Sequence, residues 1–216
     1  MHFLNTILDI VFPVYCISCG TPGSDLCEKC LSLCPSAERE SQDWIFPLFD
    51  YRHPPIKKAV WLIKYNGKKR LINTFGELLY GRIVEELSEL RIMENFNEPI
   101  LIPIPLSKKR YRESGFNQSE ILCQKLIEID QNKYLKLEKN ILIKIKETEH
   151  QARIGDRRHR LKNLSESFSV KNSEIIKRKN IILIDYVTTT GATLNEAKKI
   201  LKSFGARKVI AFTIAH

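Results

Sequence analysis

One segment, residues 180–193, constrains the fold more than any other part of the sequence. Its residues 181–184 are four consecutive branched apolar residues, the pattern of a strand that is covered on both faces, as in a parallel sheet. A parallel strand needs a crossover connection, and residues 192–204 supply one, because their apolar side chains recur at helical spacing before Gly205. A second strand is expected over residues 209–214. The sequence therefore predicts an α/β fold built on a parallel sheet.

A polar turn joins this strand to this helix. It contains an acid, three threonines and a glycine, so hydroxyls and backbone N–H groups converge where a helix begins with partial positive charge. Such a turn is typical of phosphate-binding sites. The alternative is that the threonines only cap the helix and that the glycine only makes the turn. The candidate ligand-binding residues are Asp185, Tyr186, Thr188, Thr189, Thr190, Gly191, Ala192 and Thr193.

The same segment resembles the phosphoribosyl pyrophosphate (PRPP) motif of type I phosphoribosyltransferases, in which a strand ends in two acids followed by Val-x-Thr-Thr-Gly-x-Thr. The matching residues are Asp185, Val187, Thr189, Thr190, Gly191 and Thr193. The resemblance implies that the acids bind the ribose hydroxyls and that the turn holds the 5′-phosphate. The second acid of the motif is replaced by Tyr186, so phosphate binding is expected to survive better than ribose binding.

A cysteine-rich segment precedes the predicted sheet. Two Cys-x2-Cys pairs separated by seven residues place four thiolates where they could complete one tetrahedral zinc site. Disulfides are the weaker alternative, because the cytosol keeps thiols reduced. Cys34 lies just beyond the second pair and could replace one ligand, while Cys123 lies among apolar residues and is expected to be a core thiol. The predicted ligands of a structural Zn2+ are Cys16, Cys19, Cys27 and Cys30.

The first twelve residues carry a one-sided apolar stripe at helical spacing and predict a short amphipathic helix. They lack the positive n-region and the small-residue cleavage site of a signal peptide, and no later segment is long and apolar enough to span a bilayer. We therefore expect a cytoplasmic protein without a membrane span. Its expected division is a helix and zinc-binding element over residues 1–43 and one main domain over residues 44–216.

Other apolar patterns predict further elements of the main domain. A break is expected at His53-Pro54-Pro55, and a helix follows it with Ile56, Val60, Leu62 and Ile63 facing inward. The predicted strands cover residues 44–51, 100–105 and 141–145, and the predicted helices cover residues 56–65, 71–92 and 118–129.

The end of the first of these helices is a candidate pyrophosphate-binding loop. Lys64, Tyr65 and Gly67 stand before a run of basic residues, and a short loop of this kind can present lysine and backbone N–H groups to phosphate oxygens. The alternative is a solvated basic helix terminus that is favoured by the helix dipole.

Positive charge indicates a polyanionic partner. The chain has 35 Lys and Arg against 25 Asp and Glu, for a formal net charge of +10. One basic cluster surrounds Tyr111, a combination that suits a phosphate backbone with a stacking base, and a second cluster lies near residue 158. The alternatives are a generally basic cytoplasmic protein and solvated charged helices. The candidate nucleic-acid-binding residues are Lys108, Lys109, Arg110, Arg112, Arg157, Arg158 and Arg160.

Taken together, these segments resemble the ComF family of competence-associated, phosphoribosyltransferase-like proteins. The matches cover nearly the whole chain in the family's order, which is more specific than any one motif. Ser114 replaces the arginine that the family has before Gly-Phe-Asn-Gln. The matching segments are Phe12-Pro13 with the cysteine pairs, Lys64-Tyr65-Asn66-Gly67, Pro103-Ile104-Pro105, Arg110-x-Arg112, Gly115-Phe116-Asn117-Gln118, Thr148-x2-Gln151, Arg160-x2-Asn163, Phe168 and the PRPP motif.

The ComF resemblance implies a type I phosphoribosyltransferase fold, a parallel sheet flanked by helices, with an N-terminal zinc-binding element. It also implies that the protein handles single-stranded DNA in natural transformation, binds PRPP or ribose 5-phosphate, and works with other competence proteins. The alternative is an active phosphoribosyltransferase that uses Mg2+ with PRPP. Because Tyr186 replaces the second acid, we expect ligand binding more than catalytic turnover of PRPP.

Overall fold

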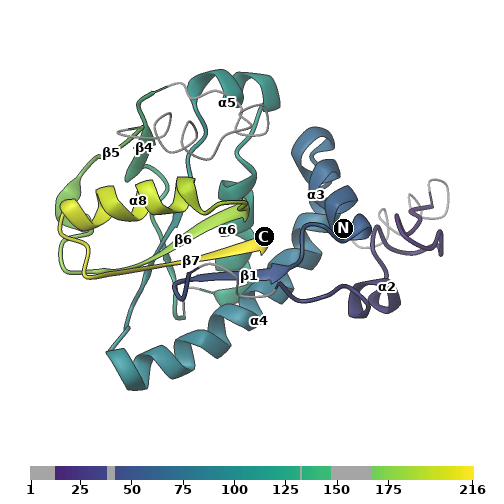
Figure 1. Ribbon diagram of the computed structural model, residues 1–216, viewed down its shortest axis with the longest axis horizontal. Coiled ribbons are helices and arrows are strands. Elements are labelled where there is room, and N and C mark those ends of the chain that lie inside the picture. Colours follow the sequence, from purple (N-terminus) through teal and green to yellow (C-terminus); the bar gives the residue numbers. More distant parts are fainter. Residues whose placement is uncertain (1–12, 38–41, 132, 147–166) are drawn as a thin grey trace.

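The computed structural model describes residues 13–37, 42–131, 133–146 and 167–216. Its centre is a five-stranded sheet in the order β1-β7-β6-β2-β3, and every pairing in it is parallel (Figure 1). The predicted parallel sheet is therefore confirmed. The strands are β1 (Ile45–Phe49), β2 (Ile100–Pro103), β3 (Lys136–Leu137), β6 (Asn180–Val187) and β7 (Lys208–Ala215).

Helices cover both faces of this sheet, because the residues of its central strands alternate between two apolar clusters. On β6, Ile182 and Ile184 pack in the cluster that contains α3 (Pro54–Asn66), α4 (Lys69–Glu94) and α6 (Gln118–Asp130). Ile181 and Leu183 pack in the other cluster, against α8 (Ala192–Ser203). All four side chains are fully buried, which is why the sequence reads as an unbroken apolar run. Gly205, with φ +93°, ends the crossover helix as expected.

A second, two-stranded sheet lies beside the main one. It pairs β4 (Leu142–Lys144) with β5 (Phe168–Val170) in antiparallel register, and its Leu142 and Phe168 belong to the cluster that contains α8. The strand predicted over residues 141–145 is thus confirmed as β4. Strand β4 does not join the parallel sheet. The strand at the β2 edge of that sheet is the two-residue β3, which the apolar pattern did not predict.

Helix α3 begins earlier than expected. Pro54 and Pro55 do not break the chain but occupy the first turn of the helix, where a missing N–H costs nothing and the fixed φ of proline suits the helix. Its buried face includes Ala59 in addition to Ile56, Val60 and Ile63. Leu62, which we expected to face inward, is only half-buried.

Three predicted features lie outside the described residues. These are the amphipathic helix over residues 1–12, the second basic cluster with Arg157, Arg158 and Arg160, and the family-matching segments Thr148-x2-Gln151 and Arg160-x2-Asn163. Among the helices that the structure describes, none combines the length and the apolar character needed to cross a membrane.

Candidate functional site

The polar turn follows β6 at the carboxyl edge of the sheet and leads into α8. Gly191 caps the helix with φ +70°, and a Cβ there would lie 3.2 Å from the Gln42 side chain and 3.3 Å from Asn195. The left-handed backbone conformation therefore favours glycine, and a side chain here would also be tightly packed. The O atom of Gly191 accepts the first helical hydrogen bond, from the backbone N of Asn195 at 2.8 Å.

A cavity of about 390 Å3 opens at this turn. Six parts of the chain contribute to it: Tyr51 after β1, the C-terminal half of α3, the segment after β2, Arg110, β4, and the end of β6 with the turn and the start of α8. Its polar and charged lining side chains come from Tyr51, Lys64, Tyr65, Arg110, Lys144, Asp185, Tyr186, Thr188, Thr189 and Thr193. The fold thus places one carboxyl group, three threonines and three cations around one space.

Asp185 is buried at the base of this cavity. Its Oδ1 accepts hydrogen bonds from Ser119 Oγ at 3.1 Å and from the backbone N of Tyr186 at 2.8 Å. Burial raises the pKa of the Asp185 carboxyl to about 6, although the two hydrogen bonds and the charges of Lys144 and Arg110 oppose that rise. The carboxyl group is therefore preorganised, and it can change protonation state close to neutral pH.

Tyr186 lines the same cavity, next to the carboxyl group. Burial and the neighbouring Asp185 both raise the pKa of its phenol, so the side chain is neutral at physiological pH. It supplies a hydroxyl that can donate or accept a hydrogen bond without adding negative charge.

The threonines of the turn divide into two groups. Thr188, Thr189 and Thr193 line the cavity, together with Gly191 and Ala192. Thr190 does not line it, and its Oγ1 accepts from the backbone N of Ala192 at 3.4 Å. For Thr190, stabilisation of the turn is therefore the better description, whereas the other three threonines line the space where a ligand would lie.

Two of the three residues predicted in a pyrophosphate-binding loop reach the cavity, but they lie in the last turn of α3 and not in a loop. Lys64 and Tyr65 line the space, and Gln118 Nε2 donates to the O atom of Lys64 at 3.2 Å, which ties the end of α3 to the start of α6. Gly67 is not among the lining residues. It ends α3 with φ +58°, and a Cβ there would lie 3.2 Å from the Phe116 ring, so close packing explains this glycine.

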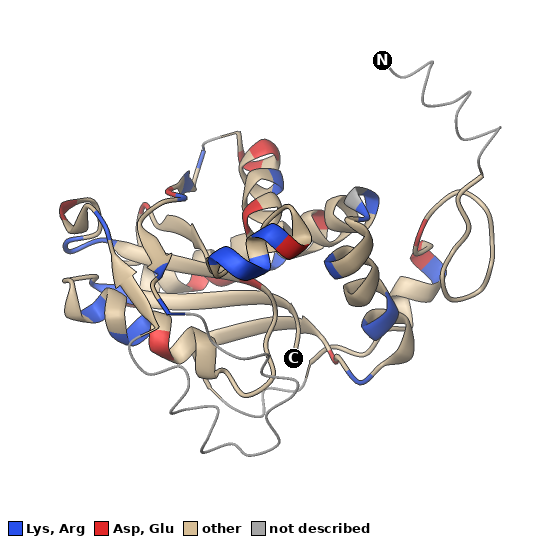
Figure 2. Ribbon diagram, turned by 90° about the horizontal axis from the view of Figure 1, so that it is seen from above, with Lys and Arg blue, Asp and Glu red and all other residues tan. Residues whose placement is uncertain are grey.

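The first basic cluster forms the short helix α5 (Lys108–Ser114), most of which is blue in Figure 2. Arg110 lines the cavity, while Lys108 and Tyr111 line an adjoining cleft, and Lys109 and Arg112 line neither space. Ser114, which stands where the family has arginine, closes the helix: its Oγ donates to the O atoms of Arg110 and Phe116 at 2.9 and 2.7 Å. The serine therefore has a local structural role.

Four residues near the turn were not singled out from the sequence. Lys144 and Tyr51 line the cavity, Trp61 lines it from α3, and Ser119 holds Asp185. Lys144 is the last residue of β4, near the end of the strand predicted over residues 141–145, and could have been suspected from its position at a strand end. For the other three, sequence carried no signal, because only the tertiary fold brings them to β6.

The four predicted zinc ligands lie together. The Sγ atoms of Cys16, Cys19, Cys27 and Cys30 all fall within 4.8 Å of one another, and the Cys19–Cys27 distance is 3.6 Å. A tetrahedral site with metal–sulfur bonds of about 2.3 Å has edges of about 3.8 Å, so this cluster fits a metal ion. The Cys34 thiol instead donates to the O atom of Cys30 at 3.2 Å and stands outside the cluster.

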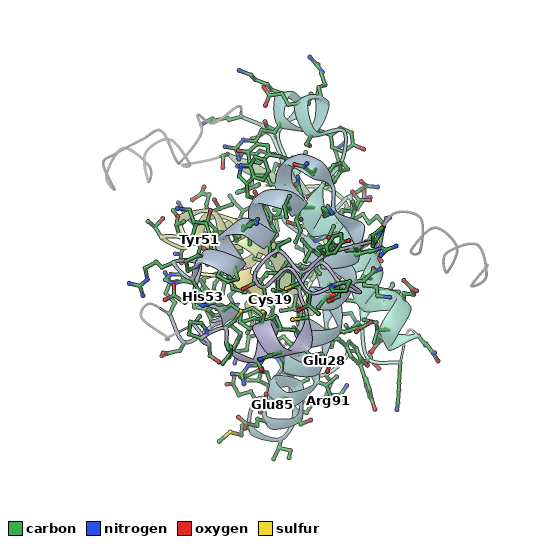
Figure 3. All side chains as sticks on the ribbon, turned by 90° about the vertical axis from the view of Figure 1, so that its right-hand side faces the viewer. Cys19, Glu28, Tyr51, His53, Glu85 and Arg91 are labelled. Carbon is green, nitrogen blue, oxygen red and sulfur yellow. The ribbon has the colours of Figure 1, made fainter. Side chains whose placement is uncertain are left out.

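The cysteine cluster is attached to the rest of the protein by side chains from α3 and from the residue that caps α4. Lys58 Nζ donates to the O atom of Ile17 at 3.0 Å, and Lys68 forms an ion pair with Asp25. Backbone N–H groups of the cluster lower the pKa of the Cys16 thiol to about 6, overcoming the opposing effect of burial. Figure 3 views the molecule with this element toward the reader, with Cys19 and Glu28 labelled.

Comparison with known proteins finds relatives along most of the chain, although no family model matches it. Competence protein ComFC of Streptococcus pneumoniae is 30% identical over 200 residues, which cover 92% of this chain and 79% of that protein. Competence protein F of Haemophilus influenzae is 29% identical over 91% of this chain and 83% of its own length. DNA utilization protein YhgH of Escherichia coli K12 is 25% identical over 90% and 80%.

Solved structures with a partial likeness are hypoxanthine phosphoribosyltransferases of Trypanosoma cruzi. One of them is 13% identical over 66% of this chain and 63% of that chain, with a TM-score of 0.41. Another is 14% identical over 66% and 65%, with a TM-score of 0.39.

Proposed function

Because the chain belongs to the ComF family of competence proteins, we propose that it binds a phosphoribosyl ligand and handles single-stranded DNA in natural transformation. The ligand is PRPP or ribose 5-phosphate. The protein would act in the cytoplasm, where its thiols stay reduced, together with other competence proteins.

One observation carries the ligand-binding part of this proposal. The threonine turn and three cationic side chains, Lys64, Arg110 and Lys144, line the same cavity although they come from four segments of the chain. Hydroxyls, backbone N–H groups at a helix N-terminus and cations are the groups that bind phosphate. Asp185, at the end of the same strand, is the acceptor that a sugar hydroxyl needs.

The DNA-binding part rests on the placement of positive charge. Helix α5 carries four cations, Lys108, Lys109, Arg110 and Arg112, in one short segment, and the side chain of Tyr111 among them is half-exposed. Cations beside an accessible aromatic ring bind the backbone of a single strand and stack on its bases. The chain's relatives named DNA utilization protein support the same assignment.

We assign the cysteine cluster to a structural Zn2+ held by Cys16, Cys19, Cys27 and Cys30. Four thiolates leave no open position for a substrate, so the ion would stabilise the fold and take no part in chemistry.

Active phosphoribosyl transfer is the alternative, and the position of the last turn of α3 favours it. Lys64 and Tyr65 face the same space as the turn, as a pyrophosphate leaving group would require. Among the described residues, however, the only carboxylate lining the cavity is Asp185. Any Mg2+ would therefore have to be held largely by the phosphates of PRPP, since this ion commonly uses one or two carboxylates together with substrate oxygens.

Three measurements test these assignments. Calorimetry should detect binding of ribose 5-phosphate and PRPP, and Thr189→Val should weaken it, with Lys177→Gln as a control on an exposed lysine outside the cavity.

Filter binding of a single-stranded oligonucleotide at two salt concentrations should show affinity that falls as salt rises. Salt-independent or undetectable DNA binding would remove the DNA-handling function. Release of pyrophosphate when the protein is incubated with PRPP and a panel of bases would establish active phosphoribosyl transfer, the alternative function.

A further inference from the structure

A second cleft, of about 640 Å3, adjoins the phosphate-binding cavity. It lies between α5 and the β4–β5 sheet, and we call it the lysine cleft. Its lysines are Lys108, Lys139, Lys144, Lys146 and Lys171. The one acid among its described lining residues is Glu120, which pairs with Lys139 at 3.1 Å, so the cleft is strongly positive.

The lysine cleft and the phosphate-binding cavity share part of their walls. Lys144, Pro105 and Leu106 line both spaces. Lys144 is the last residue of β4, so its side chain is shared by the cavity at the turn and the cleft that holds the other lysines. A ligand longer than one phosphoribosyl group can therefore start at the threonine turn and continue into the cleft.

The lining of the cleft indicates what kind of ligand would do so. Several lysines along one path attract a chain that carries repeated negative charges, and lysine binds phosphate as a point charge without selecting a base. Two apolar side chains stand exposed at the same cleft, Tyr111 and Ile145, with 51% and 56% of their surface accessible. An accessible ring beside lysines suits a stacked nucleobase.

The chemistry of the threonine turn indicates which part of such a polyanionic chain it would bind. A terminal nucleotide with a 5′-phosphate is itself a sugar 5-phosphate, and its phosphate monoester carries more negative charge than an internal phosphodiester. The 3′-oxygen of the same sugar carries the next phosphodiester. Tyr186, a neutral phenol beside Asp185, adds no negative charge that would repel this phosphodiester.

From these observations we propose that the threonine turn holds the 5′-phosphate of a single DNA strand, and that the following nucleotides lie in the lysine cleft. This inference rests on the proposed function, because it identifies the sugar-phosphate site and the DNA site as two parts of one continuous site. The protein would then recognise the end of a strand in addition to its backbone.

Oligonucleotides of one sequence that differ only at their ends test this directly. Fluorescence anisotropy with the full chain should give an affinity about tenfold higher for a 5′-phosphorylated strand than for a 5′-hydroxyl strand, as expected for a few charge-assisted hydrogen bonds. A strand phosphorylated only at its 3′ end should bind like the 5′-hydroxyl strand. Ribose 5-phosphate should compete away the advantage of the 5′-phosphate.

Two variants locate the effect. Thr189→Val should bring the affinities for 5′-phosphate and 5′-hydroxyl strands together, whereas Lys171→Gln, in the cleft, should weaken both by a similar factor. Lys177→Gln should change neither, and equal melting temperatures would establish that all three variants are folded. If strands bind equally well whatever their ends while ribose 5-phosphate still binds, the inference is wrong and the proposed function stands. If no strand binds, the DNA-handling function fails with it.

Discussion

Lys68 Nζ donates a hydrogen bond to Asp25 Oδ1 at 2.9 Å, and this ion pair joins the cysteine cluster to the loop between α3 and α4. The two partners differ in exposure: the Asp25 side chain is 4% accessible and that of Lys68 is 43% accessible. Lys68 directly follows Gly67 and caps α4, while Lys64 and Tyr65, in the last turn of α3, line the cavity at the threonine turn. The cysteine cluster is thus attached to the short loop that directly follows the helix end lining this cavity.

Loss of the lysine should destabilise the protein more than loss of the acid. Lys68→Gln leaves a buried carboxylate without its cation, whereas Asp25→Asn removes the buried charge itself. We expect Lys68→Gln to lower the free energy of unfolding by about 1–3 kcal/mol and Asp25→Asn to lower it by less. Denaturant unfolding compares the two, with Lys29→Gln on the exposed side of the cysteine element as the control. The reverse order would mean that the pair does not hold this element in place.

Asp185→Asn should stabilise the protein at pH 7. Burial raises the pKa of Asp185 in the folded protein to about 6, above the ordinary value of 3.8, so the folded state favours the protonated form. The stability that the Asp185 carboxyl contributes to the folded state is therefore present below about pH 4 and is lost as the pH rises through 6. We expect a gain of up to about 3 kcal/mol at pH 7 that shrinks toward pH 4. Unfolding curves at both pH values measure it, and a pH-independent difference would contradict the assignment.

The cysteine cluster should carry about one equivalent of zinc per chain by elemental analysis. Cys16→Ser and Cys30→Ser should lose the metal and leave the N-terminal segment sensitive to proteases, because a structural site contributes folding free energy. Cys34→Ser should keep its metal, since the Cys34 thiol donates to a backbone O atom. A wild-type protein that is stable and free of metal would refute the zinc assignment.

Local sequence signals were sufficient to predict the framework of the site. The strand β6, the turn and the helix α8 were all predicted, because each has its own local signal. These signals are an apolar run, a glycine and an amphipathic pattern. The grouping of the four cysteines followed from their spacing in the same way. In each case the residues that specify the structure are neighbours in the sequence.

The parts of the site that were not predicted depend on contacts between distant segments. Ser119 holds Asp185 from a helix 66 positions earlier, and Lys144 reaches the cavity from a strand outside the main sheet. Neither residue belongs to a motif, because its role depends on where the fold places it. The lysine cleft was missed for the same reason: Lys108, Lys139 and Lys171 are scattered in the sequence and meet only in the folded chain.

Tyr186 should decide between a free sugar phosphate and a DNA strand. In Tyr186→Asp a second carboxylate stands beside Asp185, where it can accept hydrogen bonds from the ribose hydroxyls of PRPP. We expect PRPP to bind more tightly by about 1–3 kcal/mol, while inorganic phosphate, which has no sugar, changes little. The same carboxylate would repel the phosphodiester that follows the first nucleotide, so the 5′-phosphorylated strand should bind more weakly.

Calorimetry with PRPP and inorganic phosphate, together with anisotropy on the 5′-phosphorylated strand, measures the three changes on one pair of proteins. Tyr186→Phe is the matched control, because it keeps the ring and removes only the hydroxyl. If Tyr186→Asp changes the affinity for PRPP and phosphate equally, residue 186 does not face the ribose. If PRPP binds more tightly and the strand does so as well, the 3′ side of the terminal sugar does not pass this residue, and the path of the strand from the turn to the lysine cleft must differ from the one proposed.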